Sequence, residues 1–250
     1  MSSGDLPAAL RRMWRVAPPS SRLGRPSNLD IDTVVATAVR LADAGGLDAA
    51  TLPRVAAELE VTAMSLYRHV GSKQELVQLM ADAACTPRPL AAELTGGWRA
   101  DLRDTVTALW ELYRRRPWLA HVPTESAPTG PNQMAWLDRA LASLDVGDLG
   151  WDERLRIVML LSGHVRQSIL LTQDLAAGRP ADEEQAASEA RHGRAMRELI
   201  DAEQLPQVSA LLDSNVFADT GASTEATARA DFDAGLEILL DGVAARLERT

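Results

Sequence analysis

Three helix-start signals fall between residues 51 and 75, and their close spacing restricts this part of the chain more than any other feature. Thr51 and Thr62 are residue types that favour the N-cap position of a helix. Ser72 is followed three residues later by Glu75, which fits a capping box in which each side chain binds the other's backbone N–H group. The pattern predicts a short helix, a tight turn, a second short helix and the start of a third. Paired short helices of this kind can place one helix in the major groove of DNA.

The apolar residues of this span fit helices that each bury one face. In the first predicted helix they are Leu52, Val55, Ala56 and Leu59. The second predicted helix buries Leu66 and Val70. Its outward face then consists of Ala63, Met64, Ser65, Tyr67, Arg68 and His69.

The string Ser-Leu-Tyr-Arg-His-Val at 65–70, followed by Ser72 and Lys73, resembles the DNA-reading segment of the TetR family of one-component transcriptional repressors. The resemblance implies that the second helix is the recognition helix and that Lys73 binds a DNA phosphate. The DNA-binding residues expected from it are Thr51, Thr62, Ala63, Met64, Ser65, Tyr67, Arg68, His69 and Lys73.

Lys73 is the single lysine among the 26 Lys and Arg residues of the chain. It falls in the first turn of the third predicted helix, where free N–H groups and the positive end of the helix dipole favour an anion. The position suits a phosphate clamp, and a solvated surface lysine is the alternative.

Glu60 departs from the family pattern, because the family usually carries glycine at this turn position. A residue other than glycine must there accept a left-handed or strained backbone at a cost of about 1 kcal/mol or more. Its carboxylate also adds negative charge near DNA. We therefore expect a strained turn within the helix-turn-helix.

The rest of the sequence predicts an all-α protein, because Ala, Leu, Arg and Glu recur at helical spacing and alternating Val, Ile and Thr runs are absent. Cys85 is the only cysteine, which excludes an intrachain disulfide and fits a reducing compartment. No signal peptide is evident, and the apolar run at 157–161 is far shorter than the roughly 20 residues that span a bilayer. We expect a soluble, cytoplasmic protein without a membrane partner.

The net charge of −9 is distributed unevenly. Residues 1–84 contain nine basic and nine acidic residues, whereas residues 85–250 contain 17 and 26. The excess negative charge therefore lies outside the DNA-reading part. A near-neutral head is expected to bind DNA weakly alone and to depend on dimerisation.

Three regions are predicted. Residues 1–27 are expected to form a disordered, Arg-rich arm, which could enter the minor groove or serve only as a solubilising tail. Its cations are Arg11, Arg12, Arg15, Arg22 and Arg25. Residues 28–86 are the helix-turn-helix DNA-binding domain, in which a three-helix head begins near Asp30. Residues 87–250 form a larger helical ligand-binding and dimerisation domain.

The larger domain contains five or six helical patterns. The last one repeats apolar residues as a seam that requires a partner helix, namely Phe232, Leu236, Leu239, Leu240, Val243 and Leu247. In the TetR family the last two long helices of each subunit form the dimer interface, which implies a homodimer through helices near 151–175 and 226–249. Three segments resemble the C-terminal domain of an actinobacterial-type TetR subgroup, namely Gly97-Trp98-Arg99, Arg116-Pro117-Trp118-Leu119 and Gly130-Pro131-Asn132.

A repressor of this type needs a cavity for its effector, and six Trp and seven Met residues supply apolar surface for one. The candidate ligand-binding residues are Trp110, Met134, Trp136, Met159, His164 and Gln167. For each of them an ordinary place in the core is the alternative. The four histidines are scattered and lack metal-ligand spacing, so no metal and no cofactor are predicted.

The sequence thus predicts a ligand-responsive DNA-binding transcriptional regulator, a repressor that a small, largely apolar effector releases from a palindromic operator. Two alternatives are a helical enzyme and an architectural DNA-binding protein without an effector. The chain has no P-loop, nucleophile-elbow, zincin or dinucleotide motif, so no catalytic residue and no enzymatic activity are expected.

Overall fold

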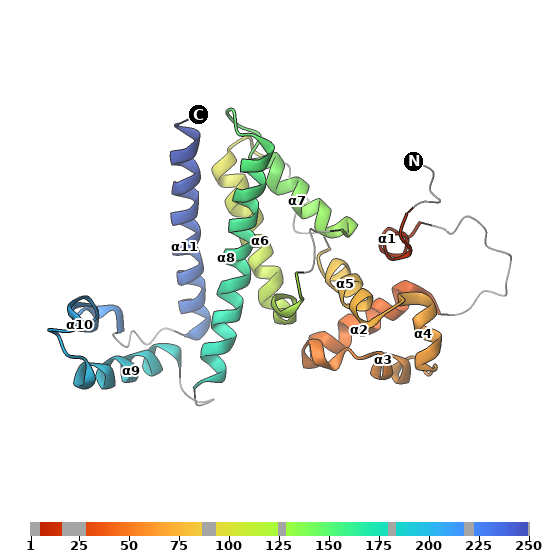
Figure 1. Cartoon of the computed structure of the whole chain (residues 1–250), viewed down its shortest axis with the longest axis horizontal. Helices are drawn as coiled ribbons and strands as arrows, with labels where there is room; N and C mark the ends of the chain where they lie inside the picture. The colour runs from red at the N-terminus through yellow and green to blue at the C-terminus, as the bar shows by residue number, and fades with distance from the viewer. Residues whose placement is uncertain are drawn as a thin grey trace.

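The computed structural model describes residues 6–16, 29–86, 94–124, 129–179, 184–217 and 223–249, and within these ranges the chain is helical without a strand. The all-α prediction is confirmed. The helices are α1 (Ala8–Met13), α2 (Ile31–Gly45), η2 (Leu47–Ala49), α3 (Leu52–Glu58), α4 (Ala63–Val70), α5 (Lys73–Ala84), α6 (Trp98–Arg115), η4 (Pro117–His121), α7 (Pro131–Ser143), α8 (Trp151–Ala177), α9 (Gln185–Leu199), α10 (Pro206–Asp213), η5 (Asn215–Phe217) and α11 (Thr224–Leu247). Helices α2–α5 form a head, and α6–α11 form a body in which α8 and α11 run side by side (Figure 1).

Local capping signals begin the head helices where the sequence predicts. Asp30, Thr51 and Thr62 each accept a hydrogen bond from the backbone amide three residues later, at 2.7, 3.4 and 3.3 Å. Helix α2 ends at Gly46, whose φ of 75° is readily adopted only by glycine. These short-range contacts set the lengths of α2, α3 and α4.

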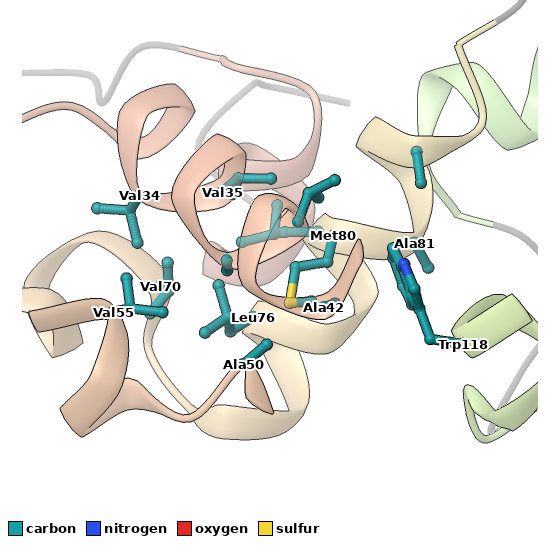
Figure 2. Packing of buried hydrophobic residues seen from close by; sticks show 14 of the residues in the cluster. Val34, Val35, Ala42, Ala50, Val55, Val70, Leu76, Met80, Ala81 and Trp118 are labelled. Carbon is teal, nitrogen blue, oxygen red and sulfur yellow. The ribbon is translucent and has the colours of Figure 1, made fainter. Parts of the chain in front are cut away.

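The four head helices meet around one apolar core. Val34 of α2, Val55 of α3, Val70 of α4 and Leu76 of α5 are fully buried there, as Figure 2 shows. Burial of such a side chain contributes about 1.5–3 kcal/mol. Packing therefore holds together helices that are too short to be stable alone.

The head core continues beyond residue 86 into the body. Trp118 of η4 packs against the head cluster and donates its indole N–H to Asp43 of α2 at 2.8 Å (Figure 2). Trp136 of α7 is also buried in this cluster and donates to the Cys85 carbonyl at 2.9 Å. Apolar contact and hydrogen bonds together join the two parts.

The body has its own core between α6, α8 and α11. Phe232, Leu236 and Leu240 of α11 are at most 1% exposed and pack in one cluster with α6 and α8 residues. The partner helices that the α11 seam requires belong to the same chain, because α6 and α8 cover it. No helix within the described ranges is long and apolar enough to cross a membrane.

The prediction of a disordered N-terminal arm is wrong for the part that the structure describes. Residues 8–13 form α1, and Met13 is buried in the head core. The Arg12 guanidinium makes two hydrogen bonds to the Glu75 carboxylate, and Arg15 pairs with Asp32. Buried Met13 and the two ion pairs hold α1 against the head, and a free arm would lack such contacts. Arg22 and Arg25 lie outside the described residues.

Candidate DNA-binding interface

Helix α4 has one buried and one exposed face. Leu66 and Val70 are fully buried, whereas Met64 and Tyr67 are 72% and 47% exposed. Large apolar or aromatic side chains held in water by a rigid helix are typical of a binding surface. The exposed face of α4 is therefore available to a partner, as the sequence predicts for a recognition helix.

The remaining predicted DNA-binding residues surround this face. Thr62 and Arg68 are exposed, and Thr51, Ala63, Ser65 and His69 are half-buried. The Ser65 hydroxyl donates to the Thr62 carbonyl at 2.7 Å, which holds the first turn of α4 closed. The pKa of Asp30, the N-cap of α2, is lowered, chiefly by the hydrogen bond from the Thr33 amide.

Lys73 is the first residue of α5 and is exposed. It follows Gly71, which ends α4 at φ 66°, and Ser72, which caps α5. A cation beside the free N–H groups of a helix N-terminus gives a DNA phosphate both charge and hydrogen-bond donors. The structure places this predicted phosphate-binding lysine directly after the end of α4.

The predicted capping box is only half formed. Ser72 Oγ accepts from the Glu75 amide at 3.0 Å, as expected. The Glu75 carboxylate does not return the bond, because it accepts from Arg12 of α1. Sequence reasoning missed this contact across 63 positions, although Leu6, Leu10 and Met13 recur at helical spacing and indicate a helix in α1.

Glu60 lies in the turn between α3 and α4 with φ 54°, the left-handed conformation that we expected. We predict that Glu60→Gly raises the free energy of unfolding by up to about 1 kcal/mol, because glycine takes this conformation without steric cost. It is also expected to tighten DNA binding, because a negative charge is removed from the head. Urea unfolding and DNA titration measure the two effects.

Glu60→Ala is the matched control, since it removes the same charge but keeps the Cβ atom. It is expected to tighten DNA binding without raising stability. Equal stability of the Gly and Ala variants would contradict strain at this turn.

The six candidate effector-binding residues lie in different surroundings. Trp110 is buried and stacks on Phe232 with ring centroids 4.9 Å apart. His164 stacks on the same ring at 5.1 Å and donates to the Phe232 carbonyl at 2.9 Å. Trp136 belongs instead to the cluster shared with the head. Met134 is half-buried on α7.

The other two candidates, Met159 and Gln167, lie exposed on the outer side of α8. Helix α8 buries one face, and its opposite face carries several large apolar residues that are 45–72% exposed, namely Trp151, Leu155, Met159, Leu160 and Leu171. Ile238 of the neighbouring α11 is also 72% exposed. This apolar stripe of α8 and α11 is a second surface suited to a protein partner.

No group of three or more His, Cys, Asp and Glu side chains within the described ranges could hold a metal ion. Cys85 is buried, and burial raises the pKa of its thiol to about 12, so it stays protonated and unreactive at neutral pH. The exposed surfaces of α4 and α8 are thus the features of the described chain that point to function.

Comparison with known proteins identifies both parts of the chain. Residues 34–80 match the bacterial regulatory proteins of the tetR family, and residues 89–247 match the tetracyclin repressor-like C-terminal domain. The HTH-type transcriptional repressor DrrR1 of Streptomyces coeruleorubidus is 35% identical over 249 residues, which cover 96% of this chain and 86% of DrrR1. An HTH-type transcriptional regulator of Saccharopolyspora erythraea is 28% identical over 60% of this chain and 66% of its own length.

Solved structures agree with these matches. Apo ActR of Streptomyces coelicolor superposes with a TM-score of 0.71 at 26% identity, covering 88% of this chain and 98% of ActR. ActR in complex with actinorhodin gives the same TM-score and identity and covers 88% of this chain and 99% of ActR. The protein therefore belongs to the TetR family of bacterial transcriptional regulators.

Proposed function

We propose that the protein is a homodimeric repressor that binds a palindromic DNA operator and is released from it by a small, largely apolar effector. The observation that carries the proposal is the exposed face of α4, with Tyr67 at its centre and Lys73 just beyond its end. A rigid reading face followed by a phosphate-binding cation is what major-groove recognition requires.

Dimerisation is supported by the apolar stripe of α8 and α11. A stripe of this kind resembles a subunit interface more than an ordinary surface, because large apolar residues follow one helix face over several turns. In a dimer built on it, two heads would enter successive major grooves about 34–36 Å apart. Two-fold symmetry of the protein implies a palindromic operator.

Repression is supported by the relationship to DrrR1, which is a transcriptional repressor. An effector is supported by ActR, whose structures include complexes with actinorhodin and with (S)-DNPA. In this chain Trp110 and His164 stack on Phe232 inside the body, so a planar apolar ligand that entered this core would meet aromatic rings. A ligand that binds more tightly to the conformation in which the two heads are wrongly spaced for DNA would stabilise that conformation. It would thereby release the protein from the operator.

The curated relatives are transcriptional regulators, and we propose that this chain likewise acts on DNA without catalysing a reaction. Since its partner would be chromosomal DNA, its proposed site of action is the cytoplasm. An architectural role without an effector is the second candidate function, and the same experiment distinguishes it.

The proposal is tested by selecting binding sites from random DNA with the purified protein. We expect an inverted repeat whose half-sites are centred about one helical turn apart. A panel of planar apolar compounds is then screened for thermal stabilisation of the free protein. An effector is expected to raise the melting temperature, because it binds the folded protein. It is also expected to weaken binding to the selected operator, because effector binding and operator binding are coupled.

Selected sequences without two-fold symmetry would contradict the repressor proposal. Compounds that stabilise the protein but leave operator affinity unchanged would favour the architectural role.

A further inference from the structure

We propose that Gly130, Pro131 and Asn132 form a socket for the Asp82 side chain, and that this joint sets the orientation of the DNA-reading head on the body. The inference rests on the proposed function, because it concerns how two heads of a dimer are held at the operator spacing. It also assigns a role to a tripeptide that the DNA-reading surface leaves unexplained.

The Asp82 carboxylate of α5 reaches into the first turn of α7. Its Oδ1 atom accepts from the backbone amides of Asn132 and Gln133, both at 3.0 Å. Its Oδ2 atom accepts from Asn132 Nδ2 at 3.2 Å, and the same amide group donates to the Asp82 carbonyl at 3.1 Å. Asp82 is only 5% exposed, so these bonds replace water at a buried carboxylate.

These contacts make Asp82 the cap of a helix to which it does not belong. The N-cap position of α7 is Gly130, which offers no side-chain oxygen to the first amides. Those amides have no acceptor within the helix, and a carboxylate at this end also interacts favourably with the helix dipole. A residue of the head therefore supplies what the start of a body helix lacks.

Each residue of the tripeptide fits this role. At φ −88° and ψ 151° the backbone of Gly130 does not itself require glycine, but a Cβ atom there would overlap the carboxylate and lie 2.7 Å from Asp82 Cβ. Pro131 occupies the first helical position, where its missing N–H leaves no donor to satisfy. Asn132 supplies both a backbone and a side-chain donor.

A second contact fastens the same segment to the head. Trp14, just after α1, donates its indole N–H to the Thr129 carbonyl at 2.7 Å. Helix α1 is itself fixed to the head by buried Met13 and by the bonds from Arg12 to Glu75. The first turn of α7 is directed toward α1 and α5 (Figure 1), so two elements of the head hold it.

The position of Asp82 on α5 couples the joint to the DNA-binding surface. Asp82 lies near the end of α5, nine residues from Lys73 at its start, or roughly 14 Å along the helix. Burial raises the pKa of Asp82, opposed by the hydrogen bonds from Gln133 and Asn132. A buried carboxylate tolerates few alternative arrangements, because any shift that breaks its bonds leaves it unsatisfied. A tilt of α7 is therefore passed to α5 and to the recognition helix.

The inference is tested with a selected operator, a half-site, and operators whose half-site spacing is changed by one base pair in either direction. Asp82→Asn keeps an oxygen for the two backbone amides but turns an NH2 group toward Asn132 Nδ2. We expect this variant to bind the correctly spaced operator roughly tenfold more weakly. Its half-site affinity is expected to stay unchanged, and its preference for the correct spacing is expected to decrease.

Two further variants strengthen the design. Adding Asn132→Asp to Asp82→Asn restores a donor–acceptor pair between the side chains but removes the donor to the carbonyl of residue 82, so it is expected to recover part of the spacing preference. Trp14→Phe removes only the indole donor at a half-exposed position, so it folds normally and is expected to reduce spacing preference to a smaller extent. Asp138→Asn, on the exposed side of α7, is the matched control and should behave as the wild type.

An unchanged spacing preference in both Asp82→Asn and Trp14→Phe would overturn the inference. Equal losses at the operator and the half-site would also overturn it, because they indicate a structural role only. Failure of the proposed function gives a different result, since the wild-type protein would then gain no affinity from a second half-site.

Discussion

Tyr67→Ala is expected to lower operator affinity by about 100-fold, because each recognition-helix contact is worth about 1–3 kcal/mol and a dimer loses it twice. The folded protein should be almost unaffected. Tyr67 is 47% exposed on α4, and Leu66 and Val70 continue to fill the core. Fluorescence anisotropy with the selected operator measures the affinity, and thermal melting verifies the fold.

Two further variants separate the contributions to this loss of operator affinity. Tyr67→Phe keeps the ring and is expected to lose only the contribution of the hydroxyl group. Lys73→Ala is expected to weaken all DNA sequences alike and to lower the slope of log affinity against log salt by about 2 for the dimer, one phosphate contact per head. If neither Tyr67→Ala nor Lys73→Ala weakens binding, α4 is not the recognition helix.

Leu160→Glu is expected to convert the dimer to a monomer and to lower operator affinity by about 1000-fold, because binding of the second head is then no longer intramolecular. Leu160 is 63% exposed on α8, so the single chain accommodates a charge there. In a dimer built on this helix, two symmetry-related carboxylates would enter an apolar interface without a counter-charge, which is strongly unfavourable. Sedimentation equilibrium and operator titration give the two measurements.

Ile238→Glu on α11 makes the same test from the neighbouring helix, since Ile238 is 72% exposed. Val16→Glu, at an exposed apolar position outside the stripe, is the matched control and should remain dimeric. A stable dimer of both Leu160→Glu and Ile238→Glu would show that the subunits associate through another surface.

The head could be predicted from sequence because its signals are short-range. Asp30, Thr51, Thr62 and Ser72 each bind an amide three residues away, so the cap and the helix that it begins are read together. The strain at Glu60 was predictable for the same reason, since it depends on one backbone position. The exposed face of α4 follows from the same local periodicity.

Contacts between distant parts of the chain could not be predicted in this way. The partner of Glu75 is Arg12, and the partner of Trp136 is the Cys85 carbonyl, 51 positions earlier. Helical spacing identifies Trp136 as buried but does not say against which element it packs. The predicted disordered arm fails for a similar reason, because Met13 of α1 is buried against head residues that lie far along the chain.

Helix α8 shows a second limit of sequence analysis. Its apolar residues cover more than one face, so periodicity alone cannot tell the side that meets α11 from the side left exposed. Met159 and Gln167, which are candidates for the effector site, lie on the outer face. The α11 seam is likewise recognisable as a packing surface, but periodicity does not say that α6 and α8 of the same chain cover it.

The two tryptophans that bridge head and body also limit how regulators of this kind can be recombined. A hybrid made by joining this head to a foreign body after residue 86 would remove Trp118 and Trp136 from the head cluster. It would also leave the Asp43 carboxylate and the Cys85 carbonyl without their indole donors. The unit that can be exchanged between regulators is therefore larger than the DNA-binding domain. A hybrid that combines a new operator with a new inducer must keep the contacts of Trp118 and Trp136 with the head or replace them.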